Sequence, residues 1–187
     1  MPESLYSDLT GKPMQNCVNC DRNIIETGEL YVLEKAFRYY PEYGFHNTIF
    51  EYIMCLPCAE EMQKSISQDS QQRIQDYFAK VSPHRDHHMT WQGEEADFEK
   101  WTSECMVKGT PKKGMEEYQI CATCEGENLV FNYYPTPLPY MLSHEASNEI
   151  AELLSAETLE EYNRFVDDNF GLPPEFKKAL KDSPVLV

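Results

Sequence analysis

Two Cys-x-x-Cys pairs constrain the fold of this chain more than any other feature of its sequence. The first pair is Cys17 and Cys20, the second is Cys55 and Cys58, and 34 residues lie between them. A Cys-x-x-Cys turn directs two sulfurs to one side of the chain, which supplies half of a tetrahedral thiolate site. We therefore expect the four cysteines to bind one structural zinc ion, although the spacing by itself also fits iron or an iron–sulfur cluster.

The segment between the two pairs predicts a β-hairpin. Residues 30–33 and 45–54 are rich in β-branched and aromatic residues and flank a turn at 40–44. The second cysteine pair then opens a helical pattern, where free amide N–H groups can stabilise negatively charged sulfurs. This order of turn, hairpin and helix resembles the treble-clef group of zinc fingers over about residues 14–80. The resemblance implies the same four ligands, and it implies no particular activity because the group has many functions.

The chain as a whole predicts an α+β protein with three regions. Pro83 and Gly93 interrupt a polar stretch without a clear period. We therefore expect a treble-clef-like zinc module at 1–81, a linker at 82–97 and a helix-rich region at 98–187.

The helix-rich region contains a short β element and several expected helices. Residues 128–134 predict a strand, Ser143 is expected to begin one helix, and Ser155 or Thr158 is expected to begin the next. A last short helix is predicted at 175–180. No long internal repeat is evident in the sequence.

Three further cysteines, Cys105, Cys121 and Cys124, leave three interpretations open. They could bind a second zinc ion together with a histidine. The last two could instead form a redox-active or free thiol pair. Alternatively, the region is a metal-free remnant of a second module, because Lys108 stands where the second cysteine of a Cys-x-x-Cys turn beginning at Cys105 would be. The candidate histidines are His84, His87, His88 and His144.

An enzyme is the alternative to a binding protein. His84, His87 and His88 lie close to several carboxylates and could form a hydrolytic metal site, but their spacing matches no established motif. Redox chemistry at Cys121 and Cys124 is disfavoured because the nearby glutamates would raise the thiol pKa values. We therefore expect binding rather than catalysis.

The charge of the chain restricts its partners. Lysine and arginine total 16 against 32 acidic residues, a formal net charge of −16. Phosphate backbones attract basic surfaces, so we expect no nucleic-acid partner. No segment has the apolar length of a membrane span, and no secretory leader is evident. The cysteine usage indicates a reducing compartment. We therefore expect a cytoplasmic protein with a protein partner.

An aromatic run marks the predicted hairpin turn. Tyrosine and phenylalanine are frequent from residue 37 to residue 45. Such side chains either pack against the following helix or form a recognition surface. The run consists of Phe37, Tyr39, Tyr40, Tyr43 and Phe45.

Overall fold

The computed structural model describes residues 1–89, 97–131 and 138–171, with the backbone alone for residues 81–89. This part of the chain is α+β and contains six α-helices, one antiparallel sheet and a short 3-10 helix, η1 (Glu3–Leu5). The helices are α1 (Ile24–Thr27), α2 (Leu56–Ser65), α3 (Gln68–Met89), α4 (Phe98–Trp101), α5 (His144–Glu152) and α6 (Ala156–Phe170). The strands are β1 (Leu30–Tyr40), β2 (Phe45–Cys55), β3 (Glu117–Glu125), β4 (Asn128–Val130) and β5 (Tyr140–Ser143).

The strands form one sheet in the order β2-β1-β3-β4, and β5 also pairs with β3. β1 and β2 are the predicted hairpin, and Gly44 closes it with a φ of 64°, a left-handed conformation that glycine adopts easily. β3 lies beside β1, with Cys121 opposite Glu34. β4 and β5 share the other edge of β3, where β5 pairs with its first half and β4 with its last residues.

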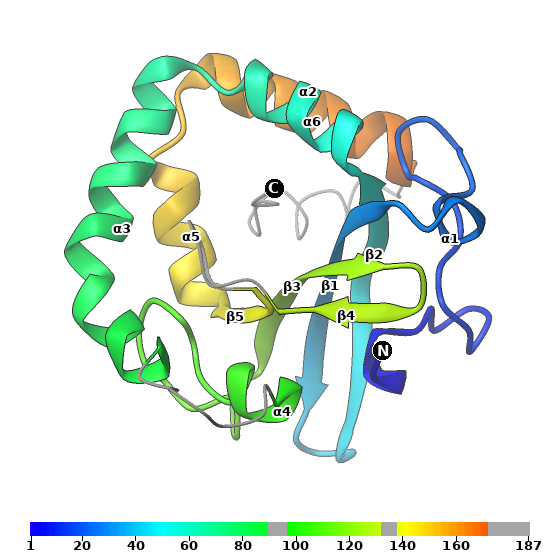
Figure 1. Ribbon diagram of the computed structural model, residues 1–187. Coiled ribbons are helices and arrows are strands. Elements are labelled where there is room, and N and C mark those ends of the chain that lie inside the picture. Colours follow the sequence, from blue (N-terminus) through cyan, green and yellow to red (C-terminus); the bar gives the residue numbers. More distant parts are fainter. Residues whose placement is uncertain (90–96, 132–137, 172–187) are drawn as a thin grey trace.

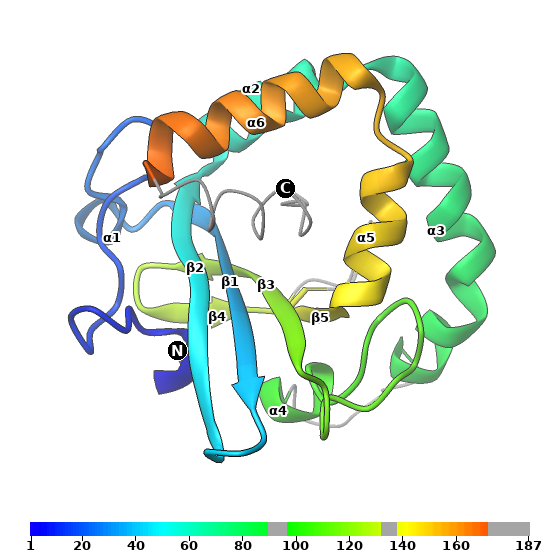
Figure 2. The same cartoon turned by 180° about the vertical axis from the view of Figure 1, so that it is seen from behind.

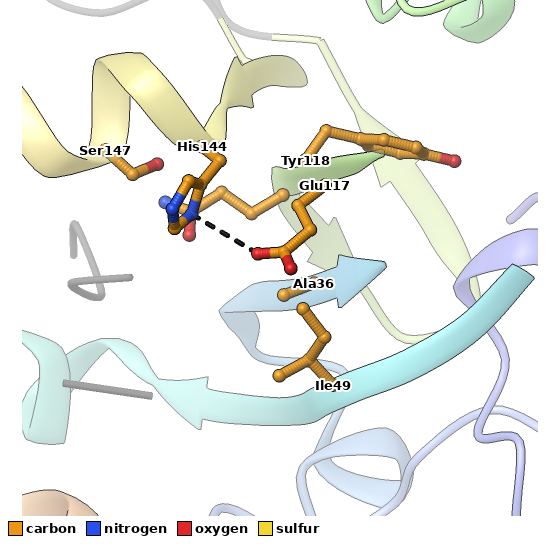
Figure 3. Close-up of a pocket in the computed structure, with 7 residues that line it drawn as sticks. Ala36, Ile49, Glu117, Tyr118, His144 and Ser147 are labelled. Atoms are coloured by element: carbon orange, nitrogen blue, oxygen red, sulfur yellow. Dashed lines mark ion pairs between the residues drawn. The ribbon is translucent and has the colours of Figure 1, made fainter. Parts of the chain in front are cut away.

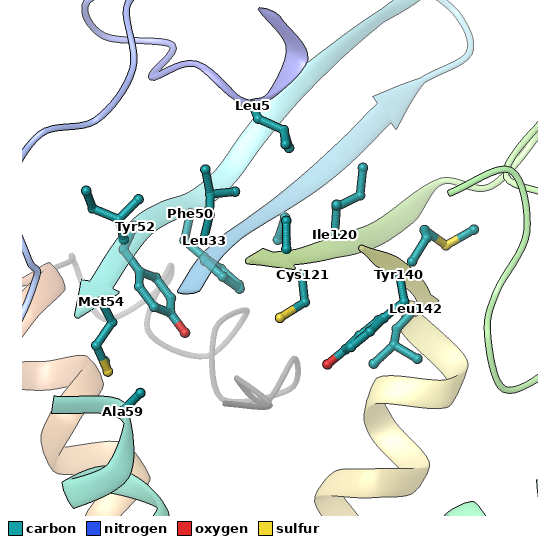
Figure 4. Packing of buried hydrophobic residues seen from close by; sticks show 14 of the residues in the cluster. Leu5, Leu33, Phe50, Tyr52, Met54, Ala59, Ile120, Cys121, Tyr140 and Leu142 are labelled. Atoms are coloured by element: carbon teal, nitrogen blue, oxygen red, sulfur yellow. The ribbon is translucent and has the colours of Figure 1, made fainter. Parts of the chain in front are cut away.

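The longer helices form an arc around one face of this sheet (Figures 1 and 2). Figure 4 shows that Tyr52, Cys121 and Tyr140 point toward this helical side. The hydroxyl of Tyr52 donates a hydrogen bond to the fully buried carboxylate of Glu34. The core on this side therefore contains polar groups among its apolar side chains.

The opposite face of the sheet is covered by the N-terminal segment. Leu5 lies on this face and is fully buried (Figure 4). Lys35, also buried, donates from Nζ to the backbone oxygen of Tyr6 at 2.5 Å and to the carboxylate of Asp8 at 2.7 Å. The carboxylate of Glu51 lies 3.0 Å from the same nitrogen. A buried ammonium group requires such acceptors, so the polar start of the chain is held against the sheet.

The structure differs from the expected linker. Helix α3 continues to Met89, whereas the sequence predicted an irregular segment from residue 82. Pro83 lacks the N–H that would bond to the preceding turn, but the helix is already nucleated and the residues that follow include no glycine before Met89. Residues 90–96 and the helix predicted at 175–180 lie outside the described residues.

The regions on either side of the predicted linker share one sheet. β1 pairs with β3 along Leu30–Arg38, and buried residues from both regions belong to one apolar cluster. The division into a zinc module and a C-terminal region stays a prediction. Among the described residues, no helix has the length and apolar character needed to cross a membrane.

Candidate metal centre

Four cysteines from the hairpin region converge on one point. The Sγ atoms of Cys17, Cys20, Cys55 and Cys58 all lie within 4.8 Å of one another. The sulfurs of Cys20 and Cys55 are 3.9 Å apart. Sulfurs that bind one zinc at about 2.3 Å in tetrahedral geometry are separated by roughly 4 Å. The four cysteines predicted from the spacing thus form a group that can hold a metal ion.

The first two cysteines lie in a tight turn. The amide of Cys17 donates to the carbonyl of Arg22 at 2.9 Å, and the amide of Asp21 donates back to the carbonyl of Cys17 at 2.9 Å. Asp21 has a φ of 56°, a left-handed conformation that aspartate tolerates better than most residues. The amide of Val18 donates to the carbonyl of Ile53 at 2.8 Å, which attaches the turn to the end of β2.

The other two cysteines lie where β2 becomes α2. Cys55 is the last residue of β2 and the N-cap of α2, and Cys58 lies in the first turn of that helix. The amide of Cys55 points at the sulfur of Cys17 at 3.4 Å. Pro57 in the first turn has no N–H to satisfy and fits this position. The helix start therefore directs a partial positive charge toward the four sulfurs.

The electrostatics of the group favour a cation. Burial raises the pKa of Cys58 to about 12, and the neighbouring sulfurs of Cys55, Cys20 and Cys17 act in the same direction. The sulfur of Cys55 and the carboxylate of Glu29 raise the pKa of the Arg22 guanidinium. Arg22 also pairs with Glu29 at 3.0 Å. A divalent ion would offset half the charge of four thiolates, whereas the single guanidinium offsets a quarter of it.

The composition of the group defines its chemistry. Four protein sulfurs complete a tetrahedron and leave no position for water or a substrate, which is typical of a structural site. Three of the sulfurs belong to buried residues and Cys20 is exposed. The arrangement thus resembles a site that cross-links the chain, and it offers no open ligand position for catalysis.

Cys121 and Cys124 do not form a Cys-x-x-Cys turn. Both lie inside β3, whose register with β1 is continuous from Leu30 to Arg38. Because side chains alternate along a strand, residues three apart point to opposite faces of the sheet. Cys121 lies beside Glu34 and Tyr140, whereas the sulfur of Cys124 contacts that of Met1 at 3.9 Å. The spacing of the two cysteines does not reveal this, because a Cys-x-x-Cys pair can lie in a turn or in a strand.

Cys105 is separated from that strand as well. It forms a bridge with Met141 of β5, and β5 in turn pairs with β3. Within the described part of the chain, the only metal-competent group of three or more ligands is the one at Cys17. A second metal site made of Cys105, Cys121 and Cys124 is therefore without support.

The redox interpretation also lacks support. Burial raises the pKa of Cys121 well above that of an ordinary thiol and raises the pKa of Cys124 to about 11. Reactive thiols need lowered pKa values and an exposed position. Both of these cysteines are buried, and they lie on opposite faces of the sheet.

The four candidate histidines lie on two helices, α3 and α5. His84, His87 and His88 lie on α3 in the part where only the backbone is described. His144 begins α5, and its Nδ1 lies 3.3 Å from the carboxylate of Glu117. This pair borders a small pocket between the sheet and α5 (Figure 3). The lining residues are Ala36, Ile49, Glu117, Tyr118, Gln119, His144 and Ser147.

Comparisons with models of known families, with curated proteins and with solved structures give no match. The functional argument therefore depends on the geometry of this chain alone.

Proposed function

We propose that this chain is a structural zinc protein of the treble-clef type that acts by binding another protein. The observation that carries the proposal is the closed group of four cysteine sulfurs within 4.8 Å of one another. The order of its parts supports the treble-clef assignment: a tight turn at Cys17, the β1–β2 hairpin, and α2 beginning at the second pair. Zinc is the ion that intracellular sites of four thiolates most often hold.

The metal would fix the base of the hairpin. It would join the turn at Cys17 to the junction of β2 and α2, where Val18 already contacts Ile53. The opposite end of the hairpin extends past the register of β1 with β3, which ends at Arg38 opposite Glu117; the next amide, that of Tyr39, still donates to the carbonyl of Glu116 at 2.6 Å. The zinc site thus provides a rigid anchor for a projecting two-stranded ribbon.

Aromatic side chains cover the projecting end. Tyr43 is 75% exposed and Phe45 is 51% exposed. The ring of Phe45 stacks on Tyr40 with centroids 5.3 Å apart and lies 6.1 Å from the ring of Tyr43. Tyr39 and His46 form a further contact at 4.7 Å. Exposed aromatic clusters of this kind are typical of protein-binding surfaces.

The charge of this end selects a basic partner. Residues 39–47 contain Glu42 and include neither lysine nor arginine, and the whole chain carries −16. The neighbouring Arg38, opposite Asn47, is paired with Glu117 at 2.6 Å. Aromatic faces attract arginine and lysine through cation–π contacts. A second copy of the chain would bring together two strongly acidic surfaces, which disfavours self-association. The proposed partner is therefore an extended basic segment of another protein.

Two measurements test the proposal. Metal analysis of the purified chain should find one tightly bound zinc, and metal-free wild-type protein would overturn the zinc assignment.

A synthetic peptide of alternating arginine and valine, about eight residues long, should bind more weakly to Tyr43→Ala/Phe45→Ala than to the wild type. We expect about a tenfold loss, since each exposed cation–π contact contributes modestly.

The matched control is Leu30→Ala, which removes a part-exposed apolar side chain from the other end of the hairpin. It should bind the peptide as the wild type does. Equal binding by the tip variant would overturn the surface assignment. Loss of a concentration-dependent dimer in the tip variant would show that this surface pairs with a second copy of the chain and would likewise overturn it.

A further inference from the structure

A second turn reproduces the hydrogen bonds of the first. The amide of Cys105 donates to the carbonyl of Thr110, and the amide of Gly109 donates back to Cys105, both at 2.8 Å. Gly109 has a φ of 63°. The amide of Met106 donates at 2.8 Å to the carbonyl of Met141, near the end of β5.

Every one of these bonds has a counterpart 88 positions earlier. Cys17 bonds to Arg22, Asp21 bonds back to Cys17, and Val18 bonds to Ile53 near the end of β2. Asp21 has the same left-handed conformation as Gly109. The residues that flank both turns also form matching antiparallel bridges, Asn16 with Asn23 and Glu104 with Pro111.

The start of the following helix is reproduced as well. Ser143 ends β5 and is the N-cap of α5, as Cys55 ends β2 and is the N-cap of α2. The amide of Ser143 points at the sulfur of Cys105 at 3.3 Å, as that of Cys55 points at Cys17 at 3.4 Å. Ala146 then takes the place of Cys58 in the first helical turn.

The strands that precede these helices share one register. Tyr31 of β1 pairs with Cys55, and Tyr118 of β3 pairs with Ser143. Further along, Glu34 pairs with Tyr52 and Cys121 pairs with Tyr140. β1 therefore corresponds to β3, and β2 corresponds to β5. The number of residues between the turn and the first strand differs by one between the two copies.

Equivalent residues also touch each other. Glu34 and Cys121 lie opposite one another where β1 and β3 meet. The hydroxyls of Ser67 and Ser155 are 2.9 Å apart, and those of Ser70 and Thr158 are 3.1 Å apart. The contacts are reciprocal, because the amide of Ser67 donates to Thr158 and the amide of Ser155 donates to Ser70. Contacts between equivalent residues are the mark of a two-fold axis.

We infer that residues 104–166 are a second copy of the module at 16–78, related to it by an internal two-fold axis and carrying a latent metal site. The positions equivalent to the four cysteines are Cys105, Lys108, Ser143 and Ala146. The comparison with a metal site rests on the proposed function of the first module.

Lys108 replaces the metal as the link between turn and helix. Its Nζ contacts the carboxylate of Glu149 and lies 3.6 Å from that of Glu145, both on α5. The hydroxyl of Tyr77 donates to the same Glu149 carboxylate at 2.6 Å. In the first module, the metal would join the turn to α2; in the second, an ion pair joins the turn to α5.

The inference predicts that three substitutions create a second tetrathiolate site. The variant is Lys108→Cys/Ser143→Cys/Ala146→Cys, which keeps Cys105 as the fourth ligand. Ser143, Ala146 and Cys105 are all buried, and the hydroxyl of Ser143 already lies 3.5 Å from the sulfur of Cys105. Titration with cobalt(II), read by its tetrahedral thiolate absorption, should give two ions per chain where the wild type gives one.

A matched control separates this site from general thiol binding. The variant Ser103→Cys/Lys112→Cys/Glu145→Cys adds the same number of cysteines near the same turn. None of its three positions corresponds to a cysteine of the first site. It should bind the same number of cobalt ions as the wild type. Equal cobalt stoichiometry in the two triple variants would overturn the inference.

A smaller variant covers the case in which the triple variant does not fold. Lys108→Cys/Ser143→Cys supplies three thiolates and should bind a second cobalt ion more weakly. Failure of both variants to gain an ion, while the wild type binds one, would overturn the inference and leave the proposed function intact. A wild type without metal beside a triple variant that gains one ion would instead overturn the proposed zinc site and support the inference.

Discussion

The turns at Cys17 and Cys105 have the same backbone hydrogen bonds, but different side chains complete them. Three cysteines join Cys17, whereas a lysine, a serine and an alanine take the equivalent places around Cys105. Cys105 accepts contacts from the amides of Lys108 at 3.5 Å and Ser143 at 3.3 Å. The same backbone arrangement thus occurs once around four convergent sulfurs and once with packing and one ion pair.

The two modules differ at their hairpins as well. The first hairpin projects beyond the sheet and exposes Tyr43 and Phe45. In the second module, β3 is followed by a tight turn at Gly126 and by β4, which pairs back onto β3. Among the described residues, the exposed aromatic pair at a hairpin end, Tyr43 and Phe45, lies in the module that also contains the four cysteines.

The largest effect should come from breaking the metal site of the first module. We expect Cys58→Ser to lower the free energy of unfolding by more than about 3 kcal/mol, because structural zinc contributes on the order of 10 kcal/mol in small modules. Denaturation at neutral pH with parallel zinc analysis measures both quantities. Unchanged stability together with full zinc content would contradict this expectation.

The equivalent of the first cysteine in the second module should matter less. Cys105→Ala removes a buried sulfur and the acceptor of two amides, which should cost about 1–3 kcal/mol. The zinc content should remain that of the wild type. A loss of zinc, or a destabilisation equal to that of Cys58→Ser, would show that the second module also depends on a metal.

The first metal group was predictable from the sequence, because two Cys-x-x-Cys pairs and the hairpin between them are local patterns. Lys108 at a cysteine position also indicated a decayed turn. The partners of Cys105 were not predictable, since Ser143 and Ala146 are not metal ligands and nothing in their chemistry points back to Cys105.

The Cys-x-x-Cys spacing at Cys121 and Cys124 was misleading. This spacing matches a turn, but pairing of β3 with β1 decides the conformation of these residues, and long-range strand pairing is not visible in a single sequence. The internal repeat was missed because few equivalent residues are identical and the spacing changes by one residue between turn and strand.

The two-fold axis itself predicts equal effects at equivalent positions. Ser67 and Ser155 each accept a hydrogen bond at 3.2 Å from the amide three residues later, and their hydroxyls meet. Replacing either with alanine should cost about 1 kcal/mol, as for other helix caps. The double variant should be non-additive by about 0.5 kcal/mol or more, because the two groups are in contact. Unequal and additive losses in denaturation experiments would argue against a symmetric contact.

The smallest effect should come from the ion pair that replaces the metal. Lys108→Met removes the partner of Glu149, and both side chains are partly exposed, so the loss should be under about 1 kcal/mol. Hydrogen bonds from Lys108 and Tyr77 lower the pKa of Glu149 from its usual 4.5. A lowered carboxyl pKa stabilises the folded state above the usual value, and this contribution is lost as the pH falls through the lowered one. The difference between wild type and variant should therefore persist at pH 7 and shrink as the pH falls below about 4.5.

Lys112→Met, which removes the exposed pair with Glu99 at 3.3 Å, is the matched control and should show a smaller difference at both ends of the titration. The difference in the free energy of unfolding between wild type and Lys108→Met could instead be as large in acid as at neutral pH. The lysine would then act through its hydrocarbon chain, and its assignment as a substitute for the metal charge would be wrong.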